Sequence, residues 1–170
     1  MDLLTEPVTL PASLPAPTSA ELAALVGGIA ADGGWRELLP ADAQAAGWSL
    51  PLLRTAAVDV ALVSWAPGQA TRAHDHGGAV GAWVVLDGEL VEDHFEDLSW
   101  DARPRRTRVA AGIPVESGAE RVHVVANPGL GPVLTIQART VGSRPARLPL
   151  VGAASILAEA APWAIGHFGR

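Results

Sequence analysis

The strongest constraint on the fold is a change of hydrophobic pattern at Val58. From there, apolar and polar residues alternate in short runs, and such alternation places successive side chains on opposite faces of a strand. Asp87-Gly88 and Asn127-Pro128-Gly129 are turn sequences between these runs. The runs that predict strands are 58–65, 72–76, 79–86, 89–95, 106–110, 120–125 and 133–140. Short strands at this spacing predict an all-β sandwich or barrel.

The first 50 residues follow another pattern. Residues 1–17 are rich in proline and predict an extended segment. Thr18 and Glu21 have the spacing of a capping box. After them, apolar residues recur on one face of a helix, at Leu22, Leu25, Val26 and Ile29. A second short helix, interrupted by Pro40, is predicted from Trp35, Leu38 and Leu39. We therefore expect short N-terminal helices before the strands.

The chain has the size of one domain, with 170 residues and neither a repeat nor a linker that would divide it. We predict a single domain over 1–170. Within it, residues 1–50 form the extended segment and helices, residues 54–140 form the barrel core, and residues 141–170 form a C-terminal extension.

Composition excludes several classes of site and partner. The chain has no cysteine, so any metal is held by His, Asp, Glu or backbone oxygen. The net charge is −6 and the basic run 103–108 is flanked by acids, so we expect no nucleic-acid partner. No apolar run reaches the roughly 18–20 residues of a membrane span. The acidic start does not resemble a secretory signal, so we expect a cytoplasmic protein without a membrane partner.

Three of the five histidines form a candidate metal site. His74 and His76 are two residues apart, so on a strand they share a face and can reach one ion at about 2.0–2.1 Å. His123 follows in a later strand, with Asn127 shortly after it. We expect His94 to be an exposed residue at a strand end and His167 to have no role at the site.

The spacing of these residues resembles the two-part signature of the cupin family. The first part contains Gly68, His74, His76 and Gly88, and the second contains His123 and Asn127. The glutamate that usually follows the first two histidines is replaced by Gly81. In lacking this glutamate, the chain resembles the cysteine dioxygenase branch of the cupins. The segments 65–76, 86–90 and 123–127 are also similar to that branch, and the resemblance runs from about Arg54 to Thr140.

The resemblance implies a jelly-roll β-barrel that holds one Fe(2+) per chain through His74, His76 and His123. Nickel and zinc also bind imidazole well, and either metal is possible in a purified sample. The implied activity is that of a non-haem iron thiol dioxygenase. It would oxidise cysteine or a related thiol carboxylic acid to a sulfinate with O2. Three neutral imidazoles leave the full charge on the ion, which favours an anionic thiolate ligand.

The residues expected to contact the substrate are less well matched to that branch. Arg54 corresponds to an arginine that would bind a substrate carboxylate. Thr135, Gln137 and Arg139 occupy alternate positions where the branch has serine, histidine and tyrosine, and this chain has no tyrosine. We expect Thr135, Gln137 and Gly81 to lie around the metal ligands. We expect Arg139 to point into the barrel toward an anionic substrate group, with pairing to an acid such as Glu116 as the alternative.

A second class of function stays open at this stage. The same triad could serve a cupin of different activity, either another metal-dependent enzyme or a ligand-binding protein without thiol dioxygenase turnover. The sequence leaves the oligomeric state open between a monomer and a homodimer.

Overall fold

The computed structural model describes residues 15–41, 47–96 and 103–142. The predictions for 1–14 and 143–170, including His167, lie outside the described residues. The described part begins with helix α1 (Ser19–Asp32) and a short 3-10 helix η1 (Gly34–Leu38). The strands that follow are β1 (Ser49–Arg54), β2 (Val58–Trp65), β3 (Gly81–Asp87), β4 (Glu89–Phe95), β5 (Arg105–Ala110), β6 (Val115–Ser117), β7 (Val122–Ala126) and β8 (Val133–Thr140).

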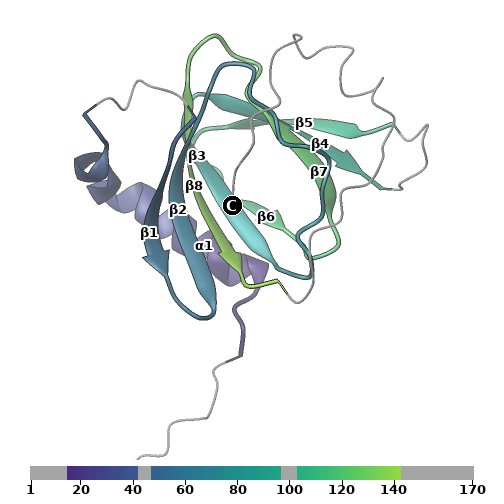
Figure 1. Cartoon of the computed structure of the whole chain (residues 1–170), viewed down its shortest axis with the longest axis horizontal. Helices are drawn as coiled ribbons and strands as arrows, with labels where there is room; N and C mark the ends of the chain where they lie inside the picture. Colours follow the sequence, from purple (N-terminus) through teal and green to yellow (C-terminus); the bar gives the residue numbers. More distant parts are fainter. Residues whose placement is uncertain (1–14, 42–46, 97–102, 143–170) are drawn as a thin grey trace, which may run out of the picture.

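The strands form two antiparallel sheets that face each other (Figure 1). The larger sheet has the order β1-β2-β8-β3-β6 and the smaller has the order β5-β4-β7. Neighbours such as β2 and β8 are distant in the sequence, with Val58 paired to Thr140, so the sheets are not simple meanders. The predicted all-β fold with a short N-terminal helix is confirmed.

Helix α1 is fixed at both ends by local sequence. The Thr18 side chain accepts a hydrogen bond from the Glu21 backbone N–H, and the Glu21 carboxylate accepts from the Thr18 backbone N–H over 2.8 Å. Gly33 ends the helix in the left-handed region at φ 78°, which glycine adopts without a steric penalty. The predicted capping box and the predicted helix are therefore confirmed.

The two faces of the larger sheet have different partners. One face packs against α1, where Leu22 and Val26 are almost fully buried (Figure 1). Its strand residues are Val60, Leu62, Ala82, Val84, Ile136 and Ala138. The other face, called the inner face here, packs against the smaller sheet through Val63, Trp65, Trp83, Val85 and Val133. These inner-face residues meet Leu90, Val109 and Val125, and together they fill one end of the space between the sheets.

Three sequence predictions need correction. Residues 72–76 do not form a regular strand, because their pairing with β7 is limited to an isolated bridge at His74. Gly77 and Gly78 both have positive φ and turn the chain away immediately after the histidines. The strand β1 lies partly in the segment assigned to the N-terminal helices, and Pro51 within it is tolerated because β1 is an edge strand. The strand β6 was also missed, because three residues are too few for a clear alternating pattern.

Among the described residues, no helix combines the length and the apolar character that crossing a membrane would require.

The packing of α1 gives a stability prediction. Leu22 is 1% exposed, whereas Leu25 on the same helix is 38% exposed. Leu22→Ala should lower the free energy of unfolding by about 2–5 kcal/mol, because it leaves a cavity against the larger sheet. Leu25→Ala should cost less than about 1 kcal/mol. Urea denaturation of both variants in the same metal state measures this, and equal losses would contradict the packing described.

Candidate metal centre

The site is built where the segment after β2 crosses β7. His74 and His123 form an antiparallel bridge, with backbone N–H groups donating to each other's carbonyls over 3.1 and 3.0 Å. Opposed residues of such a bridge project to the same side. His76 lies two residues beyond His74, while the buried Asp75 accepts a hydrogen bond from the Gly77 N–H. The bridge therefore brings three imidazoles together from two distant segments.

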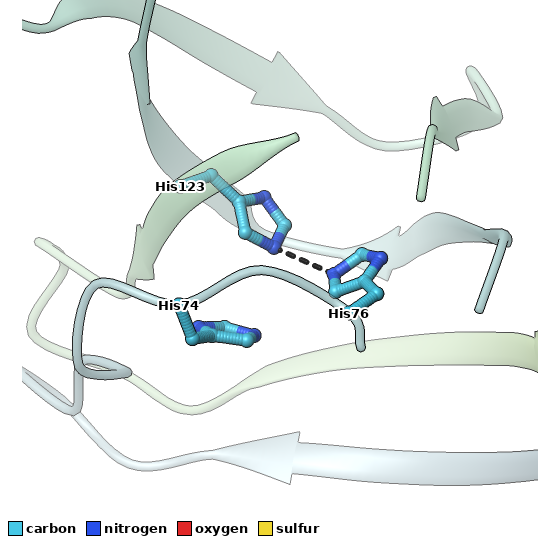
Figure 2. A group of neighbouring side chains, drawn as sticks. All are labelled: His74, His76 and His123. Atoms are coloured by element: carbon cyan, nitrogen blue, oxygen red, sulfur yellow. Dashed lines mark hydrogen bonds between the residues drawn. The ribbon is translucent and has the colours of Figure 1, made fainter. Parts of the chain in front are cut away.

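The three rings converge on one point (Figure 2). The ring centroids of His74 and His123 are 4.9 Å apart, as are those of His76 and His123, and those of His74 and His76 are 5.6 Å apart. One nitrogen from each ring lies within 4.8 Å of the other two. The Nε2 atoms of His76 and His123 are 3.0 Å apart. Two nitrogens at right angles around an ion, each about 2.1 Å from it, would have nearly this separation.

Hydrogen bonds orient two of the rings for ligation. Nδ1 of His74 donates to the Arg72 carbonyl over 2.8 Å, and Nδ1 of His123 donates to Oε1 of Glu92 over 2.6 Å. With Nδ1 protonated in both rings, Nε2 carries the lone pair. Histidines that bind metals usually have such a partner on the other nitrogen. The donor set therefore fits a divalent transition metal held by His74, His76 and His123.

Glu92 is a site residue that sequence reasoning missed. It comes from β4, is 1% exposed, and places its second oxygen, Oε2, 2.8 Å from Nη2 of Arg121. Burial alone would raise the pKa of Glu92. The hydrogen bond from His123 and the charge of Arg121 outweigh burial, so the pKa of Glu92 lies below its ordinary value. Glu92 follows Leu90 at an alternate position of the strand, so the alternation could have indicated an interior acid that needs a partner.

The site favours neutral imidazoles. Burial, followed by the proximity of His123 and His74, lowers the pKa of His76 to about 4. Burial also lowers the pKa of His74, although its hydrogen bond to the Arg72 carbonyl opposes this. Neutral imidazole is the form that binds a metal, so His76 and His74 are available as ligands below the ordinary histidine pKa.

His94 does not join the triad but lies closer to it than expected. It is half-buried rather than exposed, and its Cα pairs with that of His123 across β4 and β7. Burial and the charge of Arg121 lower the pKa of His94. His94 lies near the end of β4 as expected, but the expectation that it is exposed was wrong, because the alternation of β4 places it on the same face as Glu92.

Thr135 and Gln137 form a fixed polar pair on the inner face. Thr135 is fully buried, and its Oγ1 accepts from Nε1 of Trp65 over 3.0 Å and from Nε2 of Gln137 over 3.1 Å. The Thr135 hydroxyl therefore links the indole of Trp65 to the amide of Gln137.

The two arginines expected to bind substrate both contact Asp59. Nε of Arg54 lies 3.4 Å from Oδ1 of Asp59, and Nη2 of Arg139 lies 3.7 Å from Oδ2. Their side chains are 75% and 74% exposed, respectively. The expectation that the Arg139 side chain is inside the barrel was therefore wrong. Arg139 shares a strand face with Gln137, but it is one residue from the end of β8, and its side chain is exposed there.

The alternative partner proposed for Arg139 was also wrong. Glu116 accepts a hydrogen bond from the Ser19 hydroxyl over 2.6 Å and so lies toward α1. The acid beside Arg139 is Asp59.

Gly81 is closely packed and has little room for a side chain. A Cβ atom built there would lie 3.1 Å from the Ala138 carbonyl oxygen, which is tighter than ordinary contact. Within the described residues, the only group of acids and histidines close enough to hold an ion contains no carboxylate. The site is therefore a neutral triad, with Glu92 acting from behind one ligand.

Comparison with protein families gives a match to cysteine dioxygenase type I over residues 20–128. The match includes α1 and all three histidines but ends before β8, where Thr135, Gln137 and Arg139 lie. Comparison with curated proteins gives no match.

Two solved structures have similar folds. The TT1209 protein from Thermus thermophilus has a TM-score of 0.50 and 22% identity, and the match covers 62% of this chain and 92% of that one. A protein with a double-stranded beta-helix domain from Klebsiella pneumoniae has a TM-score of 0.52 and 19% identity, with 66% and 87% covered. At these identities the likeness supports the fold, the double-stranded β-helix of cupins.

Metal analysis of purified variants tests the triad. We predict about one metal ion per chain. His123→Ala should weaken metal binding by more than about tenfold, since even losing an outer-shell partner costs that much. His94→Ala, which removes a nearby imidazole outside the triad, should leave metal content unchanged. Normal metal occupancy in the His123 variant would refute the assignment.

A second variant pair tests Glu92. Glu92→Gln keeps the size of the side chain but removes the charge that orients His123, so metal affinity should fall about 10–100-fold. Asp93→Asn is the control, because this neighbouring acid is also buried but pairs with Arg106 instead. Competition with a chelator measures both affinities on folded protein. If the two variants bind metal equally well, Glu92 does not support the site.

Proposed function

Because the chain belongs to the cysteine dioxygenase type I family, we propose that it is an iron-dependent thiol dioxygenase acting on a small thiol carboxylic acid. The observation that carries this proposal is the neutral triad of His74, His76 and His123 without a protein carboxylate. A bound ferrous ion would supply the redox chemistry between dioxygen and sulfur. Both oxygen atoms go to the thiolate sulfur, which becomes a sulfinate, so no further reductant is needed.

The three histidines would bind the ion and leave its charge uncompensated. An anionic thiolate is favoured at such a centre, because coordination to a metal removes the thiol proton. Glu92 holds the Nδ1 proton of His123, and Arg121 holds Glu92, so the negative charge of Glu92 is balanced within the protein. The substrate therefore supplies the anionic ligand that the protein lacks.

The inner face limits the size of the substrate. Trp65, Trp83 and Val85 belong to the apolar cluster that fills one end of the barrel. Thr135 and Gln137 lie on the same face as these residues, held by the Trp65 indole. A small thiol would bind toward the other end of these strands, where Asp59 and Arg139 are paired.

One observation favours the alternative, a metal-binding cupin of different activity. Gln137 and Arg139 occupy the strand positions for which the family resemblance implied histidine and tyrosine, and neither residue can exchange a proton near neutral pH. If the family reaction needs a residue on this strand that exchanges a proton, this chain carries out a different reaction.

Oxygen uptake decides between the two functions. Protein loaded anaerobically with Fe(2+) should consume one O2 per sulfinate formed when cysteine, 3-mercaptopropionate, cysteamine or mercaptosuccinate is added. With the His123→Ala variant, oxygen uptake should be no faster than with free iron in solution. If none of the four thiols supports uptake above this control, the dioxygenase proposal fails and the alternative stands.

A further inference from the structure

His123 is oriented by a chain of contacts that leaves its own sheet. Nδ1 of His123 donates to Oε1 of Glu92 over 2.6 Å, and Nη2 of Arg121 donates to Oε2 of the same carboxylate over 2.8 Å. Nη1 of Arg121 donates to the backbone carbonyl of Glu116 over 3.2 Å. Glu116 belongs to β6, which pairs with β3 of the larger sheet. The chain therefore connects a histidine of the smaller sheet to the backbone of the larger one.

His74 is oriented in a different way. Its Nδ1 donates to the Arg72 carbonyl, which belongs to the same segment only two residues earlier. That hydrogen bond depends on the local backbone alone, whereas the orientation of His123 depends on two side chains from elsewhere in the fold. A change at Arg121 should therefore affect the His123 ring and spare the His74 ring.

The Glu92 carboxylate uses its two oxygens for different partners. Oε1 faces His123 and Oε2 faces Arg121. The Glu92 side chain is 2% exposed, so water cannot easily replace a lost donor. Without the guanidinium, Oε2 would lose a charge-assisted hydrogen bond in a buried position. The carboxylate could then turn away from His123 toward another donor.

Stability alone does not explain why Arg121 lies here. Burying an ion pair costs desolvation free energy that the attraction between the charges often only offsets. The guanidinium also carries a further cost, because Nε of Arg121 is buried and has no hydrogen-bond partner within the described residues. The contact with Glu92 is therefore better explained by what it does to the histidine behind which it lies.

We propose that Arg121 is a positioning residue of the metal centre, which holds Glu92 so that Oε1 stays directed at Nδ1 of His123. The planar guanidinium suits this role, because its two terminal nitrogens bind the Glu92 carboxylate and the Glu116 carbonyl at once. Arg121 thus keeps the His123 ring fixed relative to the other two ligands. The inference rests on the metal site of the proposed function but not on thiol turnover.

Zinc affinity, measured by competition with a chelator, tests this role on protein without redox chemistry. Arg121→Gln should weaken zinc binding by about tenfold, the lower end of the loss seen when support of a metal ligand is removed. Arg121→Lys should weaken it less, because lysine keeps the charge but loses the fork. The lysine variant also gives a result if the glutamine variant does not fold.

Arg106→Gln is the matched control. Arg106 holds Asp93, the neighbour of Glu92 in β4, through Nε and Nη2, each over 2.7 Å. Because adjacent residues of a strand face opposite sides, Asp93 points away from the side that holds Glu92. The control removes an arginine from a buried acid just as Arg121→Gln does, yet it should leave zinc affinity unchanged.

A double variant tests whether Arg121 acts through Glu92. In protein that already carries Glu92→Gln, adding Arg121→Gln should cause little further loss of zinc affinity. Residues that act independently would instead give losses that multiply, since their free energies add.

Proton NMR of the zinc-loaded protein, with isotopically labelled histidine, separates positioning from general loosening. The hydrogen-bonded Nδ1 protons of His74 and His123 should give two signals downfield of the backbone amides. Arg121→Gln should shift or broaden the His123 signal and leave the His74 signal in place. Arg106→Gln should leave both signals unchanged.

The outcomes do not depend on catalysis, because oxygen uptake is not measured. A loss of zinc affinity confined to the Arg121 variants, together with a change confined to the His123 signal, establishes the role even if no thiol is oxidised. The proposal is overturned if Arg121→Gln and Arg106→Gln bind zinc equally well, if the double variant shows multiplied losses, or if both histidine signals change together.

Discussion

The backbone bridge between His74 and His123 is the interaction on which the site depends. Its two hydrogen bonds hold an irregular segment against β7 and place the two opposed imidazoles on the same side. His76 follows in the same extended stretch, and the Gly77-Gly78 turn with positive φ then returns the chain to β3. Without this bridge, the three rings would belong to separate parts of the surface. Ring orientation then depends on Glu92 and on the Arg72 carbonyl.

Much of the fold and the ligand set could be predicted because both leave local patterns. Alternation predicted most of the strand segments, and the capping box predicted the start of α1. The spacing of His74 and His76 was informative even though they are not in a regular strand, because an extended segment also places alternate side chains on one side. The family match then showed the same branch that Gly81 had indicated.

The errors arose where the outcome depended on tertiary register. Arg139 lies near the end of β8, where it pairs with Asp59 of β2 and Gly81 of β3, and its own sequence does not encode these neighbours. His94 is half-buried because β4 pairs with β7 in a register that opposes it to His123. Glu92 was missed for the same reason, because its hydrogen bond with His123 depends on the pairing of β4 with β7. The edge strand β1 was hidden by Pro51, a residue that predicts a break rather than a strand.

The topology also has a consequence for the order of events during folding. The pairs that build the larger sheet join residues as distant as Val58 and Thr140, and the bridge at His74 joins two segments that have β3 to β6 between them in the sequence. Closing such long loops costs chain entropy before any contact is gained, so proteins of this kind fold slowly compared with helical ones. The local helix α1 and the hairpin of β1 and β2 can form early, whereas the triad needs β7 and the segment after β2 to come together. The full set of three imidazoles is therefore completed late in folding, unlike a site whose ligands all lie close together in the sequence.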